Sequence, residues 1–212
     1  MKKLLTLTVL LISCMVFAET TPIMLSLVTP VQWPDKDHEV KGLRLSLIYG
    51  ESRDFMGLDI GLINRTVGDF SGLAIGGGNI ADGTVHGLQL GIVNWNDNGR
   101  VAWGKRSIGA QIGIVNFADT FCGLQDGCVN FSRSKVTGVQ WGFFNSTKDL
   151  DGLQCGSWLI FGVNMAHGNV TGCQIGLVNY AETMVKGLQI GLVNIIENNG
   201  WLPVLPIING NF

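Results

Sequence analysis

The sequence has little charge, little proline and no long apolar run beyond its first residues. Charged residues make up 14% of the 212 positions, and the formal net charge is −2. Nucleic-acid-binding domains carry a clustered excess of Lys and Arg, so the composition excludes such a partner. Five prolines exclude collagen-like and Pro-rich disordered chains. No stretch after the N-terminus reaches the roughly 18 apolar residues of a membrane helix.

Residues with catalytic or metal-binding chemistry are also sparse. The three histidines, His38, His86 and His167, are isolated from one another and match no metal-ligand spacing. None of them can be placed beside a Ser or Cys as a general base. The sequence therefore predicts a protein that is not an enzyme and has no catalytic, metal or cofactor site.

The N-terminus has the features of a bacterial-type signal peptide. Lys2 and Lys3 form a positive region, residues 4–12 an apolar region, and Ala18 closes a small-residue cleavage site. Cleavage after Ala18 is the preferred interpretation, because the apolar run continues past Cys14. The alternative is a lipoprotein box that leaves Cys14 lipidated and the protein associated with a membrane. Both predict export, to the cell surface, outer membrane or periplasm.

Thirty glycines mark an internal repeat of about 15 residues. The clearest unit reads Gly-Leu-Gln-Ile-Gly-Leu-Val-Asn over residues 187–194. We number positions in the unit from its first glycine. The units open at Gly42, Gly57, Gly72, Gly87, Gly109, Gly123, Gly138, Gly152, Gly172 and Gly187.

Apolar residues occupy even positions of the unit, which indicates a half-buried strand rather than a helix. Positions 2, 4 and 6 are mostly Leu or Ile, and we expect them to face the core. Position 14 is apolar as well, and we expect it to point the same way. It holds Phe55, Phe70, Val85, Val136, Leu150, Val170 and Val185.

Two architectures accept this pattern. The preferred fold is all-β: a single-domain β-solenoid of about ten 15-residue coils, with N- and C-terminal caps. Fifteen is odd, so the alternation must break once per coil, and the glycine at position 1 is the expected place. The alternative is an up-and-down outer-membrane β-barrel, a small pore, with one unit per strand and Phe212 at its end.

A recurring asparagine at position 8 favours the solenoid. Parallel stacking places identical residues above one another, so amides can hydrogen-bond up an inward ladder. Antiparallel barrel strands would gain nothing from this identity. The residues are Asn64, Asn79, Asn94, Asn116, Asn130, Asn145, Asn164, Asn179 and Asn194.

A recurring glutamine at position 3 is expected on the outer surface. It is either a polar binding strip or an amide ladder that stiffens an exposed sheet. Together with its smooth glycine flanks, it could also pack against another copy, giving a homo-oligomer. The residues are Gln89, Gln111, Gln125, Gln140, Gln154, Gln174 and Gln189.

Asp126 and the cysteines depart from the repeat. Asp126 stands at apolar position 4, where a buried carboxylate is costly, so we expect a distorted coil or a paired charge. Three mature cysteines, Cys128, Cys155 and Cys173, stand at different apolar positions of different coils. The closest two, Cys155 and Cys173, are about 8 Å apart by strand geometry, too far for a disulfide. With Cys122 they are expected to be free, buried thiols.

The domain organisation follows from the extent of the repeat. Residues 1–18 form the signal peptide, residues 19–41 an N-terminal cap, residues 42–194 the ten-repeat domain and residues 195–212 a C-terminal cap. Caps with bulky and Pro residues protect the open strand edges of a solenoid.

The Gly-Leu-Gln-Ile-Gly-Leu-Val-Asn repeats resemble an uncharacterised family of bacterial surface-repeat proteins and lipoproteins. The similarity covers residues 42–194 and extends to residues 205–209. A fainter similarity relates residues 74–76 to the short β-roll repeats of trimeric autotransporter adhesins. The resemblance implies export and surface exposure, and no catalytic residue. We therefore expect a non-enzymatic exported surface or envelope protein, a binding or structural scaffold with a surface or envelope partner.

Overall fold

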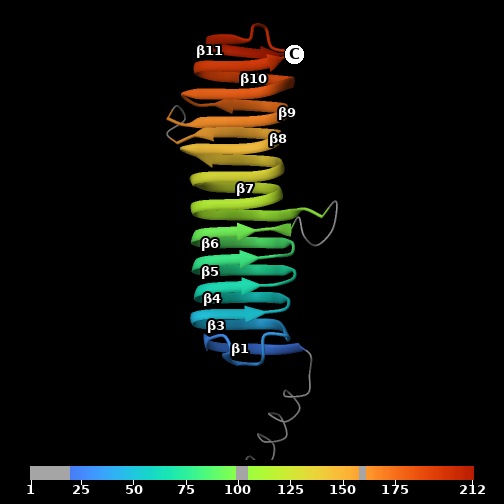
Figure 1. Ribbon diagram of the computed structural model, residues 1–212, viewed down its shortest axis with the longest axis vertical. Helices are drawn as coiled ribbons and strands as arrows, with labels where there is room; N and C mark the ends of the chain where they lie inside the picture. The colour runs from blue at the N-terminus through green and yellow to red at the C-terminus, as the bar shows by residue number, and fades with distance from the viewer. Residues whose placement is uncertain (1–19, 99–104, 158–160) are drawn as a thin grey trace, which may run out of the picture.

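The computed structural model describes residues 20–98, 105–157 and 161–212. The predicted signal peptide and Cys14 lie outside these residues. The chain winds into one long stack of β-coils (Figure 1). No helix in the described part is long and apolar enough to cross a membrane. The strands are β1 (Thr20–Val28), β2 (Val31–Trp33), β3 (Glu39–Ser52), β4 (Phe55–Thr66), β5 (Phe70–Ala81), β6 (Val85–Asn96), β7 (Ser107–Gly142), β8 (Phe144–Gly156), β9 (Val163–Ile175), β10 (Val178–Asn198) and β11 (Val204–Asn211).

Neighbouring coils pair in parallel and in register. Gly57 pairs with Gly42 on one side and Gly72 on the other, and Asn79 likewise pairs with Asn64 and Asn94. The predicted β-solenoid is therefore confirmed. Parallel pairing excludes the barrel alternative, whose neighbouring strands would be antiparallel. We number the coils 1 to 10 by their opening glycines.

The two ends of the stack differ from its middle. β1 pairs in parallel with β3, so it adds one more row below coil 1. β2 then folds back antiparallel on β1. At the other end β11 pairs antiparallel with β10. Both ends thus close with a short antiparallel strand.

Over positions 2 to 6 of the unit, the side of the strand that faces the core is the opposite of the predicted one. The position-3 glutamines are buried, whereas residues at positions 4 and 6 face outward: Ile112 is 39% and Leu192 65% exposed. The position-8 asparagines are buried, as predicted. The reason is the location of the corner. Residues at positions 6 and 7, such as Leu62 and Ile63, both face outward, so the alternation shifts there and not at position 1.

Glycine is needed at positions 1 and 5 for different reasons. All ten position-1 glycines have φ between +133° and +147°, and a Cβ on Gly109 would lie 1.8 Å from the carbonyl oxygen of Gly87. Position 5 faces inward beside the asparagines. A Cβ on Gly113 would lie 2.9 Å from Nδ2 of Asn94. Small residues at position 5 thus leave room for the asparagine side chains.

Apolar residues fill the interior at position 14, as predicted. Phe55 and Phe70 stack with ring centroids 5.5 Å apart, and both are buried. The exception is Val185, which is half exposed. The register shifts between Met184 and Lys186, so Met184 pairs with Val170 and points inward instead.

Two amide ladders run through the interior in opposite directions. Each asparagine from Asn64 to Asn179 donates from Nδ2 to Oδ1 of the asparagine in the next coil, at 2.8–3.2 Å. Asn116 lies between Asn94 and Asn130, as predicted. Each glutamine from Gln111 onward donates to the glutamine of the preceding coil, at 2.7–2.9 Å. Gln111 also donates across the interior to the carbonyl oxygen of Phe117, at 3.2 Å.

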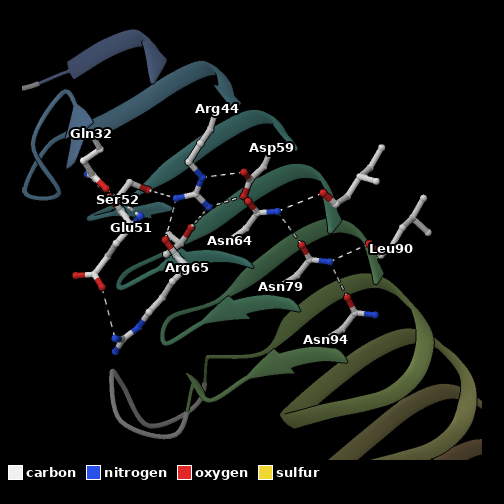
Figure 2. Close-up of polar contacts among 12 residues, drawn as sticks. Gln32, Arg44, Glu51, Ser52, Asp59, Asn64, Arg65, Asn79, Leu90 and Asn94 are labelled. Carbon is white, nitrogen blue, oxygen red and sulfur yellow. Dashed lines mark hydrogen bonds and ion pairs between the residues drawn. The ribbon is translucent and has the colours of Figure 1, made fainter. Parts of the chain in front are cut away.

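An ion pair replaces the glutamine ladder in the first two coils (Figure 2). Arg44 and Asp59 occupy position 3 and are both about 1% exposed. The Arg44 guanidinium donates twice to the Asp59 carboxylate, through Nε (2.8 Å) and Nη2, and Nη1 donates to Oγ of Ser52 at 2.8 Å. Burial raises the pKa of Asp59, and the hydrogen bonds and charge of Arg44 oppose that shift. Every polar group of this pair thus has a partner inside the stack.

Candidate binding surface

The outward residues at positions 2, 4, 6 and 7 form one apolar face along the stack, which we call the apolar face. Position 6 is its most exposed column: Leu47 is 70%, Leu62 55% and Ile92 58% exposed. Monomeric soluble proteins rarely expose contiguous apolar patches of more than a few hundred Å². Further exposed members are Leu25, Leu27, Leu45, Leu58, Ile60, Ile63, Ile75, Val93, Ile112, Ile114, Val129, Trp141, Phe143, Phe144, Leu177, Ile190 and Leu192.

Local sequence explains why successive coils resemble one another from coil 4 onward. There the inward side of the same strand carries only glycines and one amide per coil, whereas coils 1 to 3 have Arg44, Asp59 and Ala74 at position 3. Backbone pairing from β4 to β6 runs without a register shift, even through Gly76–Gly78. The three consecutive glycines therefore leave the register of the coils unchanged. Gly77 and Gly78 lie at outward positions 6 and 7, where they interrupt the aliphatic columns.

Asp126 is the charged residue on this face. It is exposed, so the burial cost anticipated from its position does not arise. Its backbone carbonyl accepts a hydrogen bond from Asn116 at 2.8 Å, as the equivalent carbonyls do in other coils. The expected distortion or pairing is wrong because position 4 faces outward. Its carboxylate divides the face into an N-terminal part, from β1 to coil 5, and a C-terminal part.

The N-terminal part of the apolar face contains a groove of about 720 Å³. One wall consists of position-4 side chains such as Leu45 and Ile60, and the other of position-6 side chains such as Leu47 and Leu62. Position-5 residues with small side chains, including Ser46, form the floor. All the lining residues are uncharged. The groove can therefore receive apolar side chains without burying an unpaired charge.

A second groove of about 540 Å³ lies on the return segments of coils 1 to 4, which are the residues from position 8 onward in each coil. Its lining combines charged residues with Ile80 and Trp95. Arg65 lies 2.8 Å from Asp82 and 3.5 Å from Glu51, and the Tyr49 hydroxyl donates to Glu51 at 2.6 Å. Hydrogen bonds to Asp82 and Tyr49 raise the pKa of Arg65. The Trp95 ring stacks on Phe117, with centroids 3.9 Å apart. The Arg65, Asp82, Glu51 and Tyr49 side chains are thus paired with one another, and none of them is an activated nucleophile.

The predicted glutamine strip is not a surface feature. All seven residues are at most 1% exposed, because position 3 faces the interior. Their ladder stiffens the core rather than an exposed sheet. They are Gln89, Gln111, Gln125, Gln140, Gln154, Gln174 and Gln189. Sequence reasoning instead missed the apolar face. The signal for it was the glycines that flank each glutamine, since a narrow interior accepts only such small neighbours.

The mature cysteines are free thiols, as the register argument predicted. Their expected burial holds for Cys155 alone: Cys122 and Cys173 are half-buried and Cys128 is exposed. Burial raises the pKa of Cys155; burial and the neighbouring Cys155 raise that of Cys173. Raised pKa values disfavour the thiolate, so neither is an activated nucleophile. Within the described residues no His, Cys, Asp and Glu side chains cluster in a way that could hold a metal ion.

Comparisons with known proteins add no functional assignment. No family model, curated protein or solved structure matches the chain. The resemblance of the repeat to bacterial surface-repeat proteins thus has no support beyond the motif itself. The geometry of the apolar face is the basis on which function can be argued.

Proposed function

We propose that the protein is a non-enzymatic, exported surface or envelope scaffold that binds through its apolar face. The observation that carries this proposal is the exposure of Leu and Ile over successive coils, on strands whose inward side carries the buried amide ladder from coil 4 onward. A sequence under no demand for binding would place polar residues at these outward positions, because apolar ones invite aggregation. The signal peptide predicted for residues 1–18 supports export.

The rigidity of the stack suits a scaffold. Two continuous amide ladders and parallel backbone pairing fix the spacing of successive outward side chains, about 4.8 Å per coil. A partner therefore meets a preformed surface and orders few side chains on binding. Preorganisation of this kind reduces the entropic cost of association.

The test is retention in the cell envelope. The full chain would be expressed in a bacterial host with its own leader, and the envelope and soluble fractions compared. Leu62→Lys with Ile92→Lys places two charges on the apolar face, and we expect it to release most of the protein into the soluble fraction. Val67→Lys with Met165→Lys places the same charges on the return segments and is expected to behave as wild type. Equal retention of all three proteins would contradict the proposal.

A further inference from the structure

We infer that the N-terminal part of the apolar face, from β1 to coil 5, is the interface of a symmetric homodimer. This inference rests on the proposed function and names the partner as a second copy of the chain. The face-to-face arrangement has its twofold axis parallel to the strands, between coils 2 and 3. Coil 4 of one copy then covers coil 1 of the other. Such a contact is isologous and closes with two copies.

The size of the surface matches what a dimer needs. Six rows spaced about 4.8 Å apart, with six residues of about 3.3 Å across each row, give a projected area of roughly 600 Å². The accessible area of a corrugated surface exceeds its projection. Two copies would therefore bury at least about 1,200 Å² in total, the lower end for specific interfaces.

The exposed columns of this surface meet themselves across the twofold axis. From β1 to coil 3 it is hollowed by the groove between the position-4 and position-6 columns. In coils 4 and 5 the position-6 residues Ile92 and Ile114, which lie outside the groove lining, are 58% and 52% exposed. A twofold axis parallel to the strands keeps each column opposite the same column, so position-6 side chains of one copy meet position-6 side chains of the other. Leu47 then lies opposite Ile92 of the second copy.

Asp126 fixes where the interface ends. Sliding the second copy toward the C-terminus would bury the Asp126 carboxylate against aliphatic side chains, and an unpaired buried charge is strongly unfavourable. The rows from β1 to coil 5 carry no charged residue on this face. Registers shifted toward the C-terminus are therefore disfavoured by charge, while registers shifted toward the N-terminus bury fewer rows.

Sedimentation velocity of the purified full chain tests the dimer. We expect wild-type protein to have the mass of two 22.9 kDa chains. Ile92→Lys should raise the dissociation constant about a hundredfold or more, since each dimer then buries two unpaired charges. Leu192→Lys is the matched control, because it makes the same change in the same column of coil 10, and should stay dimeric. A monomeric wild type, or equal effects of the two substitutions, would overturn the inference.

Charge pairing tests the register and guards against misfolded variants. Leu47→Glu alone and Ile92→Lys alone should each be monomeric. Mixed together they should form a heterodimer, because coil 1 of one chain faces coil 4 of the other. Mixing Leu192→Glu with Ile92→Lys should leave the Ile92→Lys chain monomeric. Failure of the first mixture to associate, or equal association in both, would contradict this geometry.

The outcome separates this inference from the proposed function. A monomeric wild type that still needs its apolar face for envelope retention would leave the scaffold proposal intact and remove the dimer. If the wild type is a dimer, but charges placed on the apolar face do not change its retention in the envelope, the dimer stands and the scaffold proposal is contradicted. Wild-type protein that is monomeric and binds phosphatidylcholine vesicles would assign the face to lipid and overturn the dimer.

Discussion

The first two coils and the last seven solve the same packing problem with different chemistry. In coils 1 and 2 position 3 holds the Arg44–Asp59 ion pair, whereas coils 4 to 10 hold the glutamine ladder. Ala74 of coil 3 is buried between them. Both solutions satisfy buried polar groups by pairing each coil with its neighbour. The two solutions differ in length. A ladder of identical amides can continue through any number of coils, whereas an ion pair involves only two coils.

The two regions should also differ in how much stability is lost when one buried polar side chain is replaced. Replacing one glutamine of the ladder leaves the two neighbouring glutamines short of one hydrogen-bond partner each. Their amides are neutral and keep other hydrogen bonds. An ion pair that loses one member leaves a buried charge. The N-terminal coils should therefore be the more sensitive to single substitutions and the C-terminal coils the more forgiving.

Asp59→Leu should give the largest effect. It leaves the Arg44 guanidinium buried without its carboxylate, and breaking a buried pair costs about 3–5 kcal/mol. The free energy of unfolding by denaturant measures this loss. The double substitution Arg44→Leu with Asp59→Leu is the control and should recover most of the stability, because no charge remains to be desolvated. Equal losses in the single and double variants would mean that the ion pair is not buried.

Gln140→Leu should give an intermediate effect. Nε2 of Gln154 loses one of its two acceptors and keeps the Met165 carbonyl oxygen at 3.3 Å, while Oε1 of Gln125 keeps the Ser132 hydroxyl at 3.2 Å. An unsatisfied buried group costs on the order of 1–3 kcal/mol. Denaturant unfolding should therefore place this variant between wild type and Asp59→Leu. A loss larger than that of Asp59→Leu would reverse the comparison between the halves.

The smallest effect should appear on acidification. Burial acts to raise the pKa of Asp69, but the hydroxyl and amide of Thr84, with Lys105, hold it below the usual 3.8. A lowered pKa contributes stability above pH 3.8 that is lost as the pH falls through the folded-state value. Asp69→Asn should thus weaken the pH dependence of unfolding in this acidic range. An unchanged pH profile would show that these contacts leave stability unaffected.

Sequence reasoning recovered the period, the parallel register and the asparagine ladder, but reversed the two sides of the strand. Alternation fixes which residues share a side, not which side is inside. The choice depends on where the corner lies, and two consecutive outward residues such as Leu62 and Ile63 shift the phase. Both Leu and Ile, taken alone, indicate burial. Leu and Ile are excluded from these inward positions because the interior is narrow and has room only for glycine beside an amide. The width of the interior is a property of the assembled stack.

Unfolding of two coil-9 variants tests the central claim, that amides lie inside and aliphatic side chains outside. Gln174 donates to Gln154 and accepts from Gln189, both at 2.7 Å, whereas Leu177 is 43% exposed. Gln174→Leu should cost on the order of 1–3 kcal/mol, although it makes the residue more apolar. Leu177→Ser should cost about 0.5 kcal/mol or less. A large loss for Leu177→Ser together with none for Gln174→Leu would contradict the account.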